Sequence, residues 1–382
     1  MAENLGRPIK VLHVVTRMNT GGVAVLLDDL LSFFNPHLIE ATLLTGSCDE
    51  TEEDYLSIHK PNYQLIRVTH LQKKFSLKND LQAFFEIRRS IINLHVDVVH
   101  THTSKAGLLG RLAASTVKPR PFRVHTFHGH LLTGYFSSWK TKLVYSIEKF
   151  LERFTDSFVA MGSQVRMDLE AIGLGRRASF NVFFPGLPSR VFGMKAVVRK
   201  ELALKENETY ILFVGRMTAI KRPDRLIDSI GELVKRKVDI RVLAAGDGEL
   251  LDGLRDRANE KGLPITFLGW RSDIPKLIAA SDIAVLTSDN EAVPLTLIEA
   301  SMAGLPLVST NVGSVSDVLV NEVNGYLVDN EPAALADALQ KLAIDPVLRE
   351  IMGKAGRERT SRYFSLVKMC TDHTELYQLL HR

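Results

Sequence analysis

Residues 283–300 read IAVLTSDNEAVPLTLIEA, an apolar run followed by a polar loop and then by a second apolar segment. Ile283–Leu286 predicts a buried strand, and Pro294 suits the start of a helix. A strand that leads through a loop into a helix is half of a βαβ unit, from which parallel sheets are built. We therefore expect an α/β fold in which this loop lies at the edge of a sheet.

Glu291 and Glu299 are the carboxylates of this stretch that enclose seven uncharged residues. Glu291 falls in the loop and Glu299 inside the helix, so they are too far apart to form one acid/base pair. They could instead bind different parts of an extended ligand, because one carboxylate can accept two hydroxyl hydrogen bonds. The ordinary alternative is that Glu291 interacts with the helix dipole and Glu299 ends a helix face.

Strand-like runs alternate with helix-period segments along the whole chain, as in doubly wound parallel sheets. This pattern predicts two similar Rossmann-like domains. In the first half, strands are predicted at Ile9–Val15, Ala41–Thr45, Gln64–Val68, Asp97–His100, Phe122–Phe127, Ser157–Met161 and Phe180–Phe184. In the second half they are predicted at Tyr210–Val214, Ile240–Ala244, Ile265–Leu268, Ile283–Leu286, Leu307–Ser309 and Gly325–Val328.

The domain boundaries follow from length and composition. A chain of 382 residues exceeds what one core usually serves. Residues 186–208 have the Pro, Gly and charge content of a linker, so we expect one domain over residues 1–190 and a second over 191–364. Residues 365–382 contain a last helical segment, Leu366–His381, beyond the second sheet.

Composition excludes several classes of protein. The chain is 45% hydrophobic and 24% charged, as in ordinary globular proteins, and its start resembles no signal peptide, so we expect a cytoplasmic location. Two isolated cysteines do not support a disulfide framework or a zinc site. Residues 1–190 hold 23 Lys+Arg against 17 Asp+Glu, whereas residues 191–382 hold 25 against 27. The basic first half suggests an anionic partner, but no nucleic-acid-binding motif accompanies it.

Two loops at predicted strand ends are candidates for binding phosphate. Gly21 and Gly22 follow the first strand and precede a helix, although they do not form the fingerprint of a nicotinamide site. Arg216 and Lys221 follow the strand that ends at Val214, and two cations near a helix N-terminus can hold a diphosphate. Taken alone, such a pair of cations would more often be solvated surface charge.

Several segments together resemble family 4 glycosyltransferases, especially bacterial members that build sugar polymers. The resemblance covers nearly the whole chain. The segments are GRMTAIKRPDRLI (215–227), AGDGE (245–249), FLGWRSDI (267–274), AGLP (303–306), HTHTSKAGLLGRLAA (100–114) and HTFHGH (125–130), together with the Gly21-Gly22 loop and the Glu291–Glu299 segment.

The resemblance implies a GT-B architecture, with two Rossmann-like domains facing a cleft and the final helix crossing back to the first domain. It assigns Arg216 and Lys221 to the donor diphosphate, Glu299 to the ribose hydroxyls, and Glu291 and His128 to the transferred sugar. The positions expected to bind the donor are Gly21, Gly22, Arg216, Lys221, Glu291, Leu295, Thr296 and Glu299. His128, Arg216, Lys221 and Glu291 are expected to be catalytic.

The implied reaction is retaining transfer of a hexose or N-acetylhexosamine from a nucleotide-diphosphate sugar, with UDP favoured and GDP left open, in cell-surface polysaccharide synthesis. No cofactor or metal is expected. Ala292 and Val293 stand where many relatives have a glycine after the first glutamate, and Ser314 stands where a second glycine is frequent. The donor sugar is therefore less well defined than the activity. Two alternatives are a nucleotide-sugar epimerase of the same fold and a nucleotide-sugar-binding protein without turnover.

The acceptor is expected to use the first domain. Residues 73–89 and 135–154 mix basic and aromatic side chains at helical spacing, which is typical of helices that lie on an anionic membrane surface. Any helix that covers a sheet also has an apolar face, so this pattern alone does not establish membrane contact. If the contact exists, the acceptor is a glycan on a polyprenyl or other lipid anchor, at the inner face of the plasma membrane.

Overall fold

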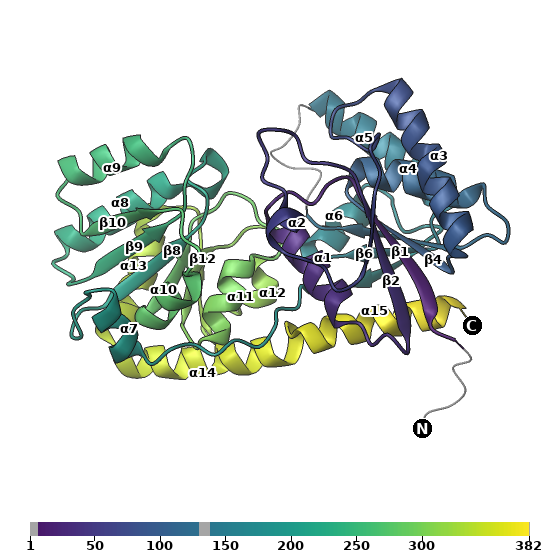
Figure 1. Cartoon of the computed structure of the whole chain (residues 1–382). Coiled ribbons are helices and arrows are strands. Elements are labelled where there is room, and N and C mark those ends of the chain that lie inside the picture. The colour runs from purple at the N-terminus through teal and green to yellow at the C-terminus, as the bar shows by residue number, and fades with distance from the viewer. Residues whose placement is uncertain (1–6, 130–137, 382) are drawn as a thin grey trace. The chain divides into compact units, whose positions relative to one another are not determined.

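The computed structural model describes residues 7–129 and 138–381, and the chain divides into two compact units. The first unit consists of Met1–Pro188 together with Ser365–Arg382, and the second of Ser189–Phe364. Each unit is a parallel sheet with helices on both faces (Figure 1). The predicted pair of doubly wound α/β domains is confirmed.

The sheet of the first unit has seven strands in the order β3-β2-β1-β4-β5-β6-β7. The strand order reverses between β1 and β4, which pair in parallel. The strands are β1 (Ile9–Val15), β2 (Ile39–Thr45), β3 (Gln64–Arg67), β4 (Val98–His102), β5 (Phe122–Phe127), β6 (Ser157–Ala160) and β7 (Ser179–Val182). The helices are α1 (Gly22–Phe33), α2 (Tyr55–Ile58), α3 (Leu77–Leu94), α4 (Ser104–Ser115), α5 (Ser138–Leu151), α6 (Ser163–Ala171) and α15 (Leu366–His381), with a 3-10 turn at Glu152–Phe154.

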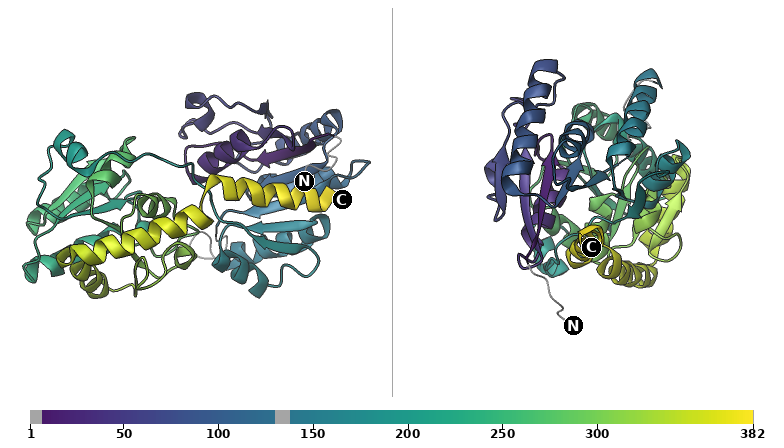
Figure 2. Two further views of the ribbon diagram at one scale, coloured as in Figure 1. Left: turned by 90° about the horizontal axis from the view of Figure 1, so that it is seen from below. Right: turned by 90° about the vertical axis from the view of Figure 1, so that its right-hand side faces the viewer.

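The two faces of this sheet are covered differently. On one face, Leu12 and Val14 of β1 pack with Ile87 of α3 and Ala106 of α4. On the other face, α15 packs against α1 and β1, and the Cys370 thiol lies 3.7 Å from the carbonyl oxygen of Leu30. Figure 2 shows α15, in yellow, running along the first unit. The last predicted helix is therefore part of the first unit.

The second unit has six strands in the order β10-β9-β8-β11-β12-β13. They are β8 (Tyr210–Val214), β9 (Arg241–Ala245), β10 (Ile265–Gly269), β11 (Ile283–Leu286), β12 (Leu307–Thr310) and β13 (Gly325–Val328). The helices are α7 (Lys195–Glu201), α8 (Pro223–Lys235), α9 (Leu251–Glu260), α10 (Ile274–Ala280), α11 (Leu295–Met302), α12 (Val315–Val318), α13 (Pro332–Ile344) and α14 (Pro346–Tyr363), with a 3-10 turn at Ala219–Lys221.

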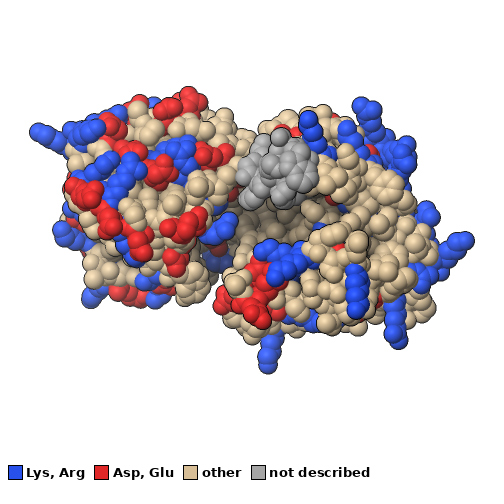
Figure 3. Space-filling model, turned by 90° about the horizontal axis from the view of Figure 1, so that it is seen from above, with Lys and Arg blue, Asp and Glu red and all other residues tan. Residues whose placement is uncertain are grey.

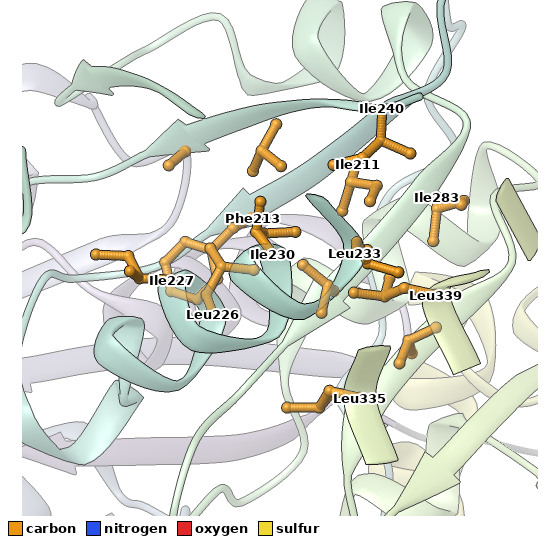
Figure 4. Packing of buried hydrophobic residues seen from close by; sticks show 14 of the residues in the cluster. Ile211, Phe213, Leu226, Ile227, Ile230, Leu233, Ile240, Ile283, Leu335 and Leu339 are labelled. Carbon is orange, nitrogen blue, oxygen red and sulfur yellow. The ribbon is translucent and has the colours of Figure 1, made fainter. Parts of the chain in front are cut away.

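The core of the second unit holds the strand ends in fixed positions. Ile211 and Phe213 of β8 pack against Leu226 and Ile230 of α8, with Leu339 of α13 in the same cluster (Figure 4). The alternating strand residues thus anchor the sheet beneath these two helices, and the loops that leave β8 and β11 start from rigid positions.

The prediction of a linker over residues 186–208 was wrong for Lys195–Glu201, which form α7. This helix packs on α10, where Val198 lies against Ala279 and Ala280. Arg199 is buried because it donates to the carbonyl oxygen of Ala280 at 2.9 Å and pairs with Asp282 at 2.6 Å. The charges of this segment predicted exposure to solvent. The sequence did not reveal that Arg199 is buried, because its partners lie about eighty residues further along the chain.

Candidate functional site

The first candidate site lies in the second unit, where the strand order reverses. Strand β8 has β9 on one side and β11 on the other, so the chain turns away in opposite directions at the ends of β8 and β11. Open α/β sheets bind ligands outside the carboxyl ends of the strands at such a point. The loop after β8 carries Lys221, and the loop after β11 carries Glu291.

Lys221 and Glu291 meet directly. The Lys221 Nζ lies 2.5 Å from Glu291 Oε1, and Ser288 Oγ donates to the same oxygen at 2.5 Å. The Glu291 side chain is only 9% exposed and that of Lys221 22%. The structure thus joins two of the predicted catalytic residues from loops 70 positions apart in the chain.

The two loops are joined by further bonds that sequence reasoning missed. Thr287 Oγ1 lies 2.9 Å from the carbonyl oxygens of Lys221 and Arg222. The buried Arg225 donates to the carbonyl oxygen of Thr287 at 2.5 Å and to Asp289 at 2.7 Å. A buried guanidinium must have such partners. The available signal was Arg225 itself, a charge on the face of α8 that otherwise carries core residues.

Glu299 lies inside α11 and has a different partner. Its Oε1 is 3.1 Å from Arg190 Nη1, and its side chain is 17% exposed. Burial raises the pKa of Glu299 above its usual value, while Arg190 acts in the opposite direction. Within residues 138–381, Glu299 forms no hydrogen bond or ion pair with Lys221 or Glu291, which pair with each other. Sequence reasoning missed Arg190, which falls in the segment interpreted as a linker.

The other predicted donor-binding residues of this unit surround the same strand ends. Arg216 is exposed and follows the end of β8. Leu295 and Thr296 form the first turn of α11, which follows Pro294 and has no side-chain cap. The first-turn N–H groups of a helix have no intrahelical acceptor and favour an anion.

The departures from the family pattern lie at the same loop. Val293 is 8% exposed and joins the buried hydrophobic residues. The Ser314 N–H donates to the carbonyl oxygen of Glu291 at 3.2 Å. The burial of Val293 and the hydrogen bond from Ser314 therefore both help to fix the backbone position of Glu291.

In the first unit, Gly21 and Gly22 lie at the carboxyl end of β1, where α1 begins without a side-chain cap. A Cβ added at Gly21 would meet nothing closer than the carbonyl oxygen of Asn19 at 3.8 Å. Packing inside the unit therefore does not require glycine at position 21. Close approach of a ligand to the backbone would require it.

His128 directly follows β5 in the first unit. Its Nε2 lies 2.9 Å from Nδ1 of His102, and burial lowers its pKa to about 4. The ring is therefore neutral near pH 7. His102 is the last residue of β4, which extends two residues beyond the predicted strand end. His130, the last residue of the quoted HTFHGH motif, lies outside the described residues.

Sequence reasoning assigned a role to His128 and to no other histidine. His13, His100 and His102 form one buried group on two neighbouring strands. The signal was their spacing, because residues two apart on a strand point to the same face.

Comparison with protein families matches both units. Residues 20–179 match the model described as "Glycosyltransferase Family 4", and residues 194–359 match "Glycosyl transferases group 1". The chain is 30% identical over 333 residues to the UDP-Gal:alpha-D-GlcNAc-diphosphoundecaprenol alpha-1,3-galactosyltransferase of Escherichia coli, covering 81% of this chain and 82% of that protein. It is 24% identical to the putative glycosyltransferase EpsD of Bacillus subtilis, covering 81% and 86%.

Solved structures share the fold over nearly the whole chain. Sucrose-phosphate synthase from Thermosynechococcus elongatus superposes with a TM-score of 0.83 at 19% identity, covering 97% of this chain and 99% of that one. HepE from Anabaena, solved in complex with UDP and glucose, gives 0.80 at 20% identity, covering 97% and 100%. Two doubly wound units of this kind constitute the GT-B fold. The chain belongs to glycosyltransferase family 4.

Proposed function

We propose that this glycosyltransferase moves a hexose or N-acetylhexosamine, with retention of configuration and without a metal, from a UDP-sugar to a glycan or polyprenyl-linked acceptor in the assembly of a cell-surface polysaccharide. The E. coli relative is named for transfer from UDP-Gal to a sugar on diphosphoundecaprenol. HepE was solved with UDP-glucose. These relatives support the donor class and the acceptor class.

The observation that carries the proposal is the set of charges at the ends of β8 and β11. Lys221 and Glu291 are held together, with Arg216 exposed on the same loop as Lys221. The first turn of α11 adds N–H groups, and Glu299 lies further along that helix. We assign the cations and N–H groups to the diphosphate, Glu291 to the sugar and Glu299 to the ribose hydroxyls.

The proposed reaction is a front-face substitution. The bond from the anomeric carbon to the diphosphate oxygen breaks, and the bond to the acceptor oxygen forms on the same face. The acceptor's proton passes to the leaving phosphate. Negative charge grows on the diphosphate, where Arg216, Lys221 and the α11 N–H groups stabilise it. These groups supply the positive charge that a metal would otherwise provide.

Binding of the donor nucleotide is tested by thermal unfolding with uridine, guanosine and adenosine diphosphates and their sugar conjugates. A ligand that binds only the folded state raises the unfolding midpoint, by about 2.7 kcal/mol in stability at a hundredfold excess over Kd. We expect a shift with UDP and UDP-sugars that Glu299→Ala largely abolishes. Glu260→Ala, an exposed carboxylate on α9, is the matched control and should keep the full shift. A wild-type midpoint that no nucleotide moves would contradict the donor assignment.

Product analysis then separates transfer from the two alternatives. Incubation with the UDP-sugar and a lipid-linked glycan should lengthen the glycan by one residue. Recovery of a UDP-sugar with an inverted carbon would indicate an epimerase. Binding without any product would indicate a nucleotide-sugar-binding protein.

We propose that the first unit also binds an anionic membrane surface. Large apolar side chains are exposed on and just before α3, and on α5. Lys and Arg side chains project around the rim of this unit in Figure 3. No helix in the part of the chain that the structure describes is long and apolar enough to span a bilayer. The exposed apolar residues of this surface include Phe75, Leu77, Leu81 and Phe85, followed by Leu143, Ile147 and Phe150.

Residues 135–137 of the second basic segment lie outside the described residues, so its surface is known only from α5. Lys73, Lys74, Lys78 and Arg89 are exposed beside the apolar residues of α3. Apolar side chains bordered by cations are typical of helices that bind anionic lipid surfaces. A lipid-linked acceptor would be reached from such a surface, at the cytoplasmic face of the membrane.

Membrane contact is tested by sedimentation with vesicles. Leu81 and Phe85 lie four residues apart and so on the same side of α3. We expect the wild type to bind vesicles containing phosphatidylglycerol at low salt, and Leu81→Glu combined with Phe85→Glu to lower the bound fraction about tenfold. Ile344→Glu, at a residue 68% exposed in the second unit, should bind as the wild type does. Equal binding by all three proteins would exclude α3 as the docking surface.

A further inference from the structure

A row of hydrogen-bonded side chains leads from α15 along one face of the sheet of the first unit to His128. The Tyr377 hydroxyl lies 3.5 Å from Nε2 of His13, and Nδ1 of His13 lies 3.1 Å from Nε2 of His102. Nδ1 of His102 lies 2.9 Å from Nε2 of His128. His100 joins the row at Tyr377, with its Nδ1 2.6 Å from the hydroxyl.

The row is buried, and its rings are neutral. His13, His100, His102 and Tyr377 are at most 1% exposed. Burial lowers the pKa of His13 to about 3 and that of His100 and His102 well below the usual value. Each imidazole in the row therefore carries one proton near pH 7.

Because each imidazole carries only one proton, all the hydrogen bonds between the rings must run in the same direction from donor to acceptor. A neutral imidazole has one N–H donor and one lone-pair acceptor. If His13 accepts a hydrogen bond at Nδ1, its proton is on Nε2, from which it must donate. The donor to His13 Nδ1 is then Nε2–H of His102, so His102 must accept a hydrogen bond at its own Nδ1. The same rule applies to His128, so the direction at one end of the row fixes the tautomer at the other.

Tyr377 sets that direction because its one proton has two neighbouring nitrogens. His100 Nδ1 is 2.6 Å away, whereas His13 Nε2 is 3.5 Å away. Hydroxyl donors make the shorter hydrogen bonds and lose strength rapidly with distance. The proton therefore goes to His100, which then donates from Nε2 to Thr126 Oγ1 at 2.6 Å. The phenol oxygen is left to accept from His13 Nε2–H.

We propose that this row holds His128 with its proton on Nε2 and its lone pair on Nδ1, so that Nδ1 accepts a hydrogen bond from a hydroxyl of the bound sugar. Among the described residues, no atom forms a hydrogen bond with His128 Nδ1, although that atom is buried. Tyr377, His13 and His102 are positioning residues that act through His128. The inference rests on the proposed function and on the family resemblance, which assigns His128 to the transferred sugar.

A metal centre is the other arrangement that three clustered histidines suggest, since ligand atoms of His13, His100 and His102 lie within 4.8 Å of one another. The rings of His100 and His102 are stacked, with centroids 4.4 Å apart and planes 27° apart. Lone pairs lie in the ring planes, so stacked rings do not direct them at one ion. The hydrogen bonds of the row also use both nitrogens of all three rings.

The tautomers can be read in the wild-type protein, without nucleotide or sugar, by long-range proton–nitrogen NMR on protein labelled with ¹⁵N-histidine. His128→Gln identifies the His128 signals. We expect a protonated Nε2 and an unprotonated Nδ1 for His13, His100, His102 and His128. A proton on Nδ1 of His128, or a mixture of its two tautomers, would overturn the proposal. Zinc that binds tightly and shifts the signals of His13, His100 and His102 together would also overturn it, in favour of a metal centre.

Tyr377→Phe tests the direction of the row. Loss of the hydroxyl removes both the donor to His100 and the acceptor for His13, so His128 should become a mixture of tautomers. Tyr63→Phe is the matched control, because its hydroxyl donates to Asp28 at 2.8 Å and contacts none of these histidines. A single unchanged His128 tautomer in Tyr377→Phe would show that the row does not control it.

The link to catalysis is tested on the same variant. Tyr377→Phe should lower kcat about tenfold or more while the UDP-induced shift in unfolding midpoint stays as in the wild type. Unchanged kcat in a variant whose His128 tautomer has changed would overturn the positioning role. If UDP fails to bind even to the wild type, the proposed function fails, whereas the NMR result on the row still stands.

Discussion

Replacing Lys221 with alanine is expected to lower kcat by a factor on the order of 10²–10³, comparable to the loss of one preorganised charge-stabilising group in other enzymes. Lys221 is held by Glu291 and by the short turn that follows β8, so its position is fixed before the donor binds. A charge that needs no reorganisation acts most strongly when negative charge develops on the leaving diphosphate. Steady-state transfer rates at saturating donor measure the effect.

Lys235→Ala provides the matched control. This lysine is 74% exposed at the end of α8 and pairs with Glu232 on the same helix. Its removal should leave kcat within about twofold of the wild type. Because Lys221→Ala also leaves Glu291 without its cation, the unfolding midpoint is measured on the same preparation. A folded Lys221→Ala protein with wild-type kcat would refute the role of Lys221 in catalysis.

Gly246→Ala is expected to destabilise the second unit by roughly 3 kcal/mol or more, the range of severe single substitutions. A Cβ at this position would lie 1.9 Å from the carbonyl oxygen of Gly215, and the residue has φ +139°, which side-chain-bearing residues rarely adopt. The clash involves backbone at the end of β8, which cannot rotate away. Urea unfolding followed by circular dichroism measures the loss.

Gly253→Ala is the contrasting substitution in the same unit. Gly253 lies within α9, and an added Cβ would meet nothing within 4 Å. Alanine should raise stability there by roughly 0.5–1 kcal/mol, because it restricts the unfolded chain and favours a helix. If both alanine variants unfold at the same urea concentration, close packing of the loop at Gly246 does not contribute to the stability of the second unit.

The fold was largely predictable because its signal is local. The bounds of β1 and β8 are the same as those of the short apolar runs that predicted them. Pro223 is the first residue of α8, a position that suits proline. Arg199 shows the limit of this reasoning. Its charge predicted solvent, yet Asp282 and a carbonyl group satisfy it inside the unit. Composition cannot reveal a partner that lies far along the chain.

The candidate site was only partly predictable. Lys221 and Glu291 were expected to share one ligand, and the structure brings them into contact. Arg190 was missed, since its pairing with Glu299 depends on where the chain enters the second unit. The histidine row was missed for a similar reason. It needs the register that pairs His13 with His100, and a tyrosine from a helix 277 residues away.

The discontinuity of the first unit has a consequence for synthesis on the ribosome. Its sheet is encoded before Pro188, but α15 is encoded after the whole of Ser189–Phe364. At about 5–20 residues per second, the nascent sheet waits roughly ten to forty seconds for the helix that covers one of its faces. During that interval the face later covered by Leu376 and Tyr377 is open to chaperones. Synthesis of the first unit thus begins before that of the second unit but ends after it. The second unit is synthesised in full before the first unit can fold completely.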